Sequence, residues 1–194
     1  MIEYIENKTL GEGYYKITHG SGLAIYVYPK EGYNSSYAVF GTNYGSVDTC
    51  FKRSDRDGFT TIPAGTAHFL EHKLCESEEL GAFERYAKTG ASANAYTGFD
   101  RTCYLFSCTG SFKENFEILI DFVRHPYFTE ETVRKEQGII GQEIDMYRDV
   151  PDWECLFNML KCMYHTHPVK TDIAGTKESI SQITAQMLHE CYAT

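Results

Sequence analysis

The sequence lacks an excess of positive charge: 18 Lys and Arg stand against 27 Asp and Glu, a formal net charge of −9. Such a chain offers no basic face for phosphates, so nucleic acid is not expected as a partner. No uncharged apolar run approaches membrane-spanning length, and the first residues lack a cationic segment followed by an apolar one. We therefore expect neither a membrane span nor a secretory signal.

Paired cysteines are also missing. The seven cysteines are odd in number and scattered, and none forms a C-x-x-C pair. This pattern is typical of free thiols in a reducing compartment rather than of a disulfide framework. Together with the missing signal, it predicts a cytoplasmic protein.

The overall composition is typical of a folded globular protein, because 42% of the 194 residues are apolar and 23% are charged. Strands are expected at Tyr14–His19, Leu23–Pro29, Tyr37–Gly45, Ser92–Thr97 and Thr102–Cys108. Helices are expected at Thr66–Cys75, Glu79–Lys88, Ser111–Pro126, Glu130–Arg148, from Pro151 onward and from Thr184 onward. Most strands precede most helices, which predicts an α+β fold with a largely antiparallel sheet packed on a group of helices.

Local signals set the bounds of these elements. Ser111 with Glu114 has the spacing of a capping box, Thr129 is a suitable N-cap, and Gly90 is a suitable C-terminal glycine. The segment Asp48–Gly65 is expected to be a polar loop. No repeat or linker is visible, so residues 1–194 are interpreted as a single domain.

The strongest chemical signal is an H-x-x-E-H motif formed by His68, Glu71 and His72. On a helix, positions four apart lie only about 40° apart around the axis, so both imidazoles point the same way. Two histidines one turn apart can bind one zinc ion, and the neighbouring carboxylate can reach a water molecule on it. The competing interpretation is a pair of surface histidines on an ordinary helix.

A catalytic zinc needs a third protein ligand, and the helix Glu130–Arg148 offers Glu136 and Glu143. They are seven residues apart and share one face with Ile140, so both carboxylates are predicted to point inward. A buried acid is costly unless it is paired or bound to a metal. Gly138 and Gly141 in the same helix suggest that another backbone approaches closely there.

At this point the sequence resembles the pitrilysin and insulin-degrading enzyme family of zinc peptidases, the inverzincins. The resemblance rests on Gly65–His72, Ser92–Thr97, Glu136–Glu143 and the loop His167–Thr176, and Glu143 lies 71 residues after His72, in the right region. It is closest to uncharacterised bacterial members with H-F-L-E-H-K-L and Q-G-I-I-G-Q-E. These segments together disfavour the surface-histidine interpretation.

The resemblance implies a mitochondrial-processing-peptidase-like metallohydrolase fold and one Zn²⁺ per chain. It implies that His68, His72 and Glu143 bind the zinc, that Glu71 is the general base, and that Glu136 supports the ligands from behind. The expected function is that of a zinc endopeptidase that hydrolyses short or unfolded peptides with a metal-activated water. The peptide is expected to add as a β-strand beside Asn94, Ala95 and Tyr96.

Family members carry two homologous halves that close around a chamber. The resemblance covers only the N-terminal half, and the chain stops before the strand expected to finish that half, so we expect a truncated piece. Its second half would lie in the same or a partner chain, and these 194 residues alone are expected to be weakly active or inactive.

Three rival functions belong to other classes. An S-ribosylhomocysteine-lyase-like metalloenzyme would need a cysteine as third ligand, and none lies between Cys108 and Cys155. A non-catalytic assembly subunit of the same fold would be expected to have lost a ligand or the base. A peptide-binding module without turnover could describe the fragment rather than its parent. Metal content together with peptide cleavage by the full-length protein would separate them.

Overall fold

The computed structural model describes residues 1–53 and 55–194 and divides the chain into two compact units. The first unit, Met1–Asn34, is an antiparallel meander of β1 (Ile2–Asn7), β2 (Glu12–Thr18) and β3 (Ala24–Val27). The hairpin between β2 and β3 agrees with the sequence prediction. Strand β1 was not predicted, and all but one of its residues are exposed, so it shows no buried face by which to recognise it.

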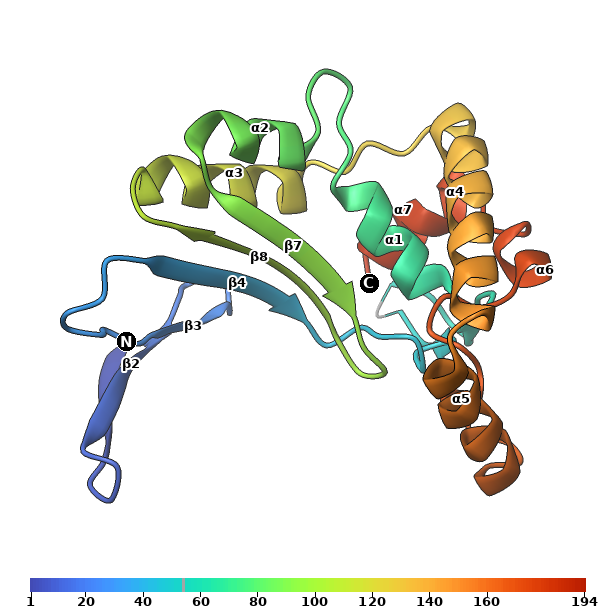
Figure 1. Ribbon diagram of the computed structural model, residues 1–194, viewed down its shortest axis with the longest axis horizontal. Coiled ribbons are helices and arrows are strands. Elements are labelled where there is room, and N and C mark those ends of the chain that lie inside the picture. Colours follow the sequence, from blue (N-terminus) through green and yellow to red (C-terminus); the bar gives the residue numbers. More distant parts are fainter. Residues whose placement is uncertain (54) are drawn as a thin grey trace. The chain divides into compact units, whose positions relative to one another are not determined.

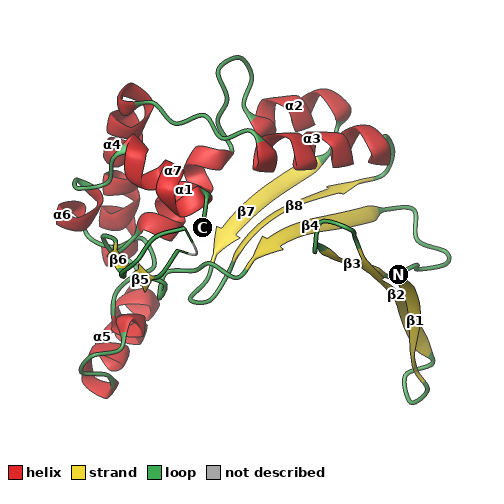
Figure 2. Ribbon diagram, turned by 180° about the vertical axis from the view of Figure 1, so that it is seen from behind, coloured by secondary structure: helices red, strands yellow, loops and turns green. Residues whose placement is uncertain are grey.

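The second unit, residues 35–194, contains a sheet in the order β4-β8-β7. Its strands are β4 (Ser36–Thr42), β7 (Ser92–Thr97) and β8 (Thr102–Cys108), and both pairings are antiparallel. Helices α2 (Ala82–Thr89) and α3 (Phe112–Arg124) lie along one face of this sheet (Figures 1 and 2). The predicted α+β class with a largely antiparallel sheet is confirmed.

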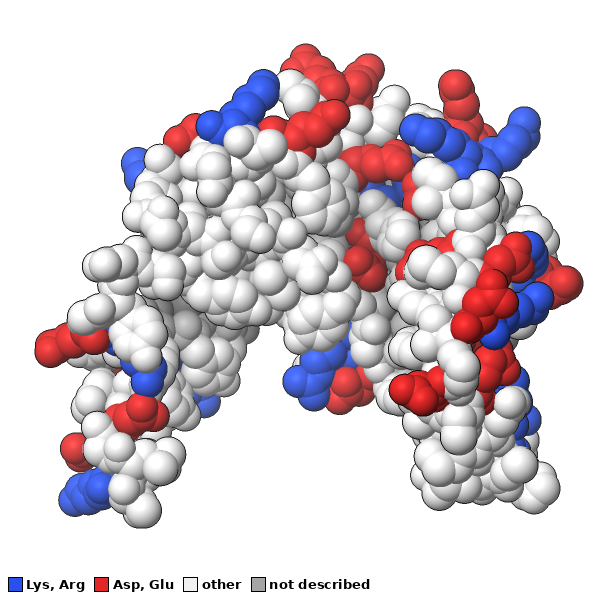
Figure 3. Space-filling model, in the orientation of Figure 1, with Lys and Arg blue, Asp and Glu red and all other residues white. Residues whose placement is uncertain are grey.

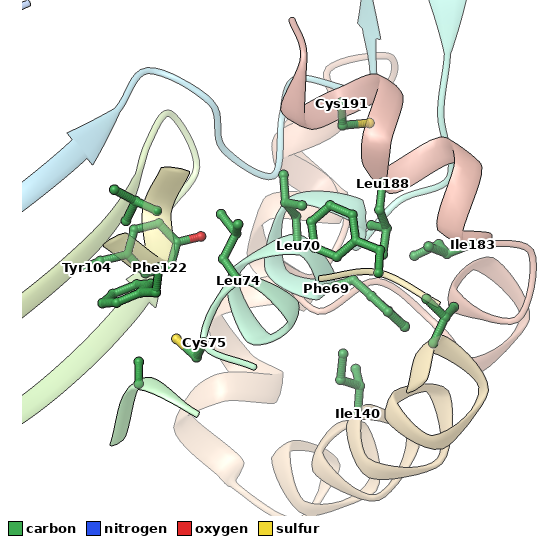
Figure 4. Packing of buried hydrophobic residues seen from close by; sticks show 14 of the residues in the cluster. Phe69, Leu70, Leu74, Cys75, Tyr104, Phe122, Ile140, Ile183, Leu188 and Cys191 are labelled. Carbon is green, nitrogen blue, oxygen red and sulfur yellow. The ribbon is translucent and has the colours of Figure 1, made fainter. Parts of the chain in front are cut away.

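Helix α1 (Thr66–Leu74) is buried on almost every side, and of the remaining helices two pack against it directly, one of which also carries two others. The remaining helices are α4 (Glu130–Arg148), α5 (Pro151–Met163), α6 (Lys177–Ile180) and α7 (Ala185–Tyr192), with a short 3-10 turn, η1, at Pro168–Lys170. Figure 4 shows Phe69 and Leu70 of α1 within the same apolar cluster as Ile140 of α4 and Leu188 of α7. None of the helices in the described residues is long and apolar enough to cross a membrane.

Several predicted bounds agree with the structure, because local hydrogen bonds set them. The Thr129 hydroxyl accepts the Thr132 amide at the start of α4, the Thr184 hydroxyl accepts the Met187 amide at the start of α7, and Gly90 ends α2 in the left-handed conformation. These are the geometries that Thr and Gly favour at helix ends.

Three predictions about local structure are wrong. Ser111 makes no capping bond. Its backbone has a φ of 51° and is left-handed, whereas an N-cap residue needs an extended backbone. The expected polar loop Asp48–Gly65 contains the two-residue strands β5 (Cys50–Phe51) and β6 (Thr60–Thr61), while Ser54 lies outside the described residues. Helix α2 begins at Ala82 rather than at Glu79, because the Glu84 carboxylate accepts the Gly81 amide there.

The two glycines of α4 do not admit another backbone. A Cβ at Gly138 would meet nothing within 4 Å, and one at Gly141 would meet only Lys177 Cε, at 4.0 Å. The close approach lies instead at the start of α1. Gly65 has a φ of +89°, and a Cβ there would lie 2.4 Å from the carbonyl oxygen of Ala174. This contact fixes the helix that carries the H-x-x-E-H motif against the loop before α6.

We therefore expect Gly65→Ala to lower the free energy of unfolding by about 2 kcal/mol or more, through backbone strain and overpacking. Gly138→Ala is the matched control and should raise it by about 0.5–1 kcal/mol, because its site is an exposed helix interior with free space. Urea unfolding of the metal-free proteins measures both. Equal stability of Gly65→Ala and the unmodified protein would contradict the packing described here.

Candidate metal centre and peptide cleft

A cleft of about 970 Å³ lies beside the H-x-x-E-H motif. It is lined by residues of β7 on one side and by residues of α1, α4 and the loop around Asp172 on the others. Figure 3 shows acidic side chains along this hollow. Glu71, Glu136 and Glu143 all line it, so the three predicted carboxylates share one site.

The structure brings the three predicted metal ligands together. His68, His72 and Glu143 each offer one ligand atom, and these atoms lie within 4.8 Å of one another. The Nε2 atom of His68 lies 3.6 Å from one carboxylate oxygen of Glu143, and the Nε2 atom of His72 lies 3.5 Å from the other. Both imidazoles therefore present the same nitrogen to one point between α1 and α4.

Glu136 contacts His72 at Nδ1, the ring nitrogen that does not face Glu143. Glu136 is 4% exposed, and its Oε1 lies 2.8 Å from Nδ1 of His72. A carboxylate only accepts, so we assign the His72 proton to Nδ1, which leaves the Nε2 lone pair directed at the cluster. Burial is the largest single effect and raises the pKa of Glu136, but the hydrogen bond to His72, the charge of His72 and smaller effects of Glu76 and Lys73 together outweigh it, so the pKa of Glu136 is lowered.

The protonation of the two histidines follows from their surroundings. Burial and the neighbouring His72 lower the pKa of His68 to about 3, so His68 is a neutral imidazole near neutral pH. Burial alone would lower the pKa of His72, but the bond to Glu136 and the charge of Glu71 raise it. Nδ1 of His68 is buried without a hydrogen-bond partner among the described residues, so only Nε2 is placed for a polar interaction.

Glu71 lies in the same cleft and is bound by a residue of the sheet. The Thr97 hydroxyl, at the end of β7, donates to Oε2 of Glu71 at 2.9 Å. Burial raises the pKa of Glu71, and the charge of His72 and the Thr97 bond act against that effect. A buried carboxylate with a raised pKa suits a group that takes up a proton and returns it. Sequence reasoning missed the contribution of Thr97, because no local pattern joins it to Glu71.

Strand β7 is the edge of its sheet in the part of the chain that the structure describes, since β8 is its only partner. Asn94 and Tyr96 are exposed on one face, whereas Ala93, Ala95 and Thr97 are half-buried on the other. Strand β7 thus has the edge position that the expected addition of a peptide strand requires. An edge strand has unpaired main-chain donors and acceptors along its free side.

An aromatic pair forms another part of the cleft wall. Tyr147 stacks on Trp153 with ring centroids 4.7 Å apart, and the Trp153 indole N–H donates to Asp172 at 2.5 Å. All three residues line the cleft. The packing of Trp153 and Asp172 beside Tyr147 depends on α5 and the loop that follows it, and no local sequence pattern links these segments to α4.

The donor set fits a zinc ion. Two imidazole nitrogens and one carboxylate are a common protein ligand set for catalytic zinc, and the open cleft leaves room for a further ligand. The carboxylate behind His72 is the usual partner of a metal-binding histidine. The residues present therefore match zinc in kind, number and mutual placement.

Comparison with known proteins agrees with this geometry. The family described as insulinase (peptidase family M16) matches residues 61–177, more than half of the chain. The Bacillus subtilis protein YmfH, described as an uncharacterized zinc protease, is 54% identical over 194 residues, which are 100% of this chain and 45% of that protein. The chain thus spans less than half the length of this relative.

Solved structures give the same result. The crystal structure of an M16-like peptidase from Alicyclobacillus acidocaldarius has a TM-score of 0.89 and 42% identity, covering 100% of this chain and 43% of that one. Pitrilysin, at 18% identity and a TM-score of 0.77, shares the fold over 99% of this chain and 21% of its own. Since the family match, the identity to YmfH and the shared fold agree, the chain belongs to the insulinase family of peptidases, M16.

Proposed function

We propose that this chain is the metal-binding N-terminal half of a zinc endopeptidase that hydrolyses short or unfolded peptides. The observation that carries the proposal is the convergence of His68, His72 and Glu143 from two helices, with Glu71 beside them in an open cleft. Zinc held by these three residues would supply Lewis-acid chemistry and make water a nucleophile near neutral pH.

The chain's own residues would then carry out the proton transfers. Glu71 would accept a proton from the attacking water and deliver it to the amine that leaves when the peptide bond breaks. Thr97 would orient Glu71 through its hydroxyl. Glu136 would hold His72 in the tautomer whose Nε2 lone pair is available to the metal.

The peptide would bind as an added strand beside β7. The free edge of β7 ends at Thr97, whose side chain contacts Glu71, so a strand paired there runs past the general base. Asn94, Ala95 and Tyr96 all line the cleft. Backbone pairing does not depend on the peptide's side chains. It therefore allows peptides of many sequences to bind, but the bound segment must be extended and unfolded.

We also propose that a second, homologous half in the same or a partner chain completes the chamber. The chain spans 45% of YmfH and 43% of the Alicyclobacillus peptidase, which leaves room for such a half. Residues 1–194 would form one N-terminal catalytic domain whose activity alone is weak or absent, since half of the groups that orient the peptide are missing.

The test is cleavage of quenched fluorescent peptides by the whole protein. Cleavage is expected to disappear on chelation and to return with zinc. A peptide N-methylated at the amides that pair with β7 should be cleaved at least about 10-fold more slowly, because it loses backbone hydrogen bonds. Zinc-loaded protein that binds a varied pool of peptides and cleaves none would instead identify a non-catalytic peptide-binding subunit.

A further inference from the structure

A second pocket, of about 400 Å³, adjoins the peptide cleft. We call it the side pocket; it lies between α4, α5 and the segment of residues 170–176. Tyr147 and Asp172 line both the side pocket and the cleft, so a ligand that fills one cavity can extend into the other. The predicted metal ligands do not line the side pocket, which is therefore a neighbour of the candidate metal centre and not a part of it.

The buried part of the side-pocket lining is apolar. Ile144 of α4 and Phe157 of α5 are 5% and 3% exposed. The ring of Phe157 is held by Trp153, with ring centroids 5.2 Å apart, and by Phe99, with centroids 6.2 Å apart. Such a surface is already packed from behind, so it favours an apolar group of the ligand over water.

The exposed part of the lining is positively charged, because Arg148, Lys161 and Lys170 all line the side pocket. The ion pairs of the described residues do not include Lys161 or Lys170. The Lys170 ammonium donates to the main-chain carbonyl of His165, which carries no charge. Arg148 lies 4.0 Å from Asp145, and both are more than half exposed, so this pair is weak.

Two acids also line the side pocket, but both have other partners. Asp172 accepts from the Trp153 indole through Oδ2 and from the Ala174 amide through Oδ1. Glu154 accepts from Asn158 within α5, at 3.5 Å. Three cations therefore face two acids, and the pocket keeps an excess of positive charge.

The cleft has the opposite charge. Among the described residues, Lys135 is the only Lys or Arg that lines it, and acidic side chains follow its hollow (Figure 3). A free carboxylate is repelled by the cleft and attracted by the side pocket. Asp and Glu carry a carboxylate without an apolar side chain, whereas an apolar residue at a peptide C-terminus carries both groups on one Cα. That residue matches an apolar surface beside cations.

We propose that the side pocket binds the C-terminal residue of a peptide whose preceding residues lie in the cleft. Its apolar side chain would contact Ile144 and Phe157, and its α-carboxylate would lie beside Lys161 and Arg148. This inference rests on the proposed function, because it takes the cleft to bind peptides. It narrows the substrate class to peptides with a free, apolar C-terminus within reach of the cleft.

The test measures peptide binding to the whole protein after removal of metal, so that cleavage does not interfere. Fluorescence polarisation compares two labelled pools of random peptides that end in leucine, one as the free acid and one as the amide. We expect the acid to bind about 5- to 10-fold more tightly, because the amide loses a charge-assisted interaction. In Lys161→Met this ratio should fall to about 2-fold or less, since the cation is gone.

Lys113→Met is the matched control, at an exposed lysine of α3 that lines neither cavity. It should keep the acid-to-amide ratio of the unmodified protein. Lys161 is exposed, so its replacement is expected to leave the fold intact, which circular dichroism checks. Equal binding of the two pools by the unmodified protein overturns the proposal, as does a ratio that Lys161→Met leaves unchanged.

A third pool separates the C-terminal carboxylate from acidic side chains. Its peptides are amidated and carry aspartate before the final leucine, and they should bind as weakly as the plain amide. Binding as tight as that of the free acid would show that the pocket accepts any carboxylate, and the C-terminal assignment would be wrong. If the zinc-loaded whole protein cleaves no peptide, the proposed function fails, whereas the acid-to-amide ratio still reports on the side pocket.

Discussion

Glu71→Gln is expected to abolish peptide cleavage by the whole protein while its zinc remains bound. Glutamine keeps the size of the side chain and can still accept from the Thr97 hydroxyl. An amide cannot take up a proton near neutral pH, so kcat should fall by about 10²- to 10⁴-fold, the range for loss of a general base. Steady-state kinetics and metal analysis on the same preparation measure both quantities.

The matched control is Glu117→Gln, at an exposed glutamate of α3 that does not line the cleft. It should leave kcat and zinc content unchanged. Loss of zinc together with loss of activity in Glu71→Gln would place Glu71 among the ligands and overturn the division of roles. Undiminished kcat would remove Glu71 from the mechanism.

His68→Ala and Glu143→Ala are each expected to reduce zinc from one ion per chain to a small fraction. Each change leaves two protein ligands. The resulting loss of zinc affinity should exceed the roughly 100-fold loss that follows when a residue supporting a ligand is changed. The proteins are equilibrated with the same free zinc before analysis, because chelators or acid can strip such a site. Circular dichroism checks that each variant is folded.

His165→Ala is the matched control for these variants, because His165 is an exposed histidine in the segment after α5. Its zinc content should equal that of the unmodified protein. One zinc per chain in both His68→Ala and Glu143→Ala would refute the ligand assignment, whatever the activity of the variants.

The elements that a sequence can reveal here are those with local causes. Thr129 and Thr184 cap their helices with their own hydroxyls, and β7 alternates small inward residues with exposed Asn94 and Tyr96. The motif His68–His72 needs only the period of one helix to bring its two imidazoles together. Glu136 and Glu143 could be placed on the same face for the same reason.

The errors concern features that depend on distant parts of the chain. Close backbone packing was predicted at Gly138 and Gly141. The structure has it instead between Gly65 and Ala174, which are more than 100 residues apart in the sequence. Ser111 has the right residue type for a cap, but the turn that leads into α3 gives it a positive φ. No local pattern reports such contacts.

Lys73 shows the same limit within the site. A lysine beside a motif on an amphipathic helix would ordinarily face solvent, but α1 is enclosed by α4, α7 and the sheet. Its burial follows from this tertiary packing, whereas its partner Glu76 is a local neighbour three residues on. The sequence and the family resemblance thus pointed to His68, His72, Glu143 and Glu136, whereas the burial of Lys73 and the bond from Thr97 to Glu71 had no local signal.

The side chains of β7 face alternate sides of the sheet, and this limits the registers in which another strand can pair with β7. Successive side chains of a β-strand face opposite sides of the sheet, so a shift of one residue exchanges the faces and a shift of two restores them. A peptide that moves along β7 in steps of two keeps the same side chains toward Thr97 and Glu71. If a peptide pairs with β7 as proposed, only shifts of an even number of residues keep the same face toward Glu71. Alternative cut sites in one peptide should therefore be separated by even numbers of residues.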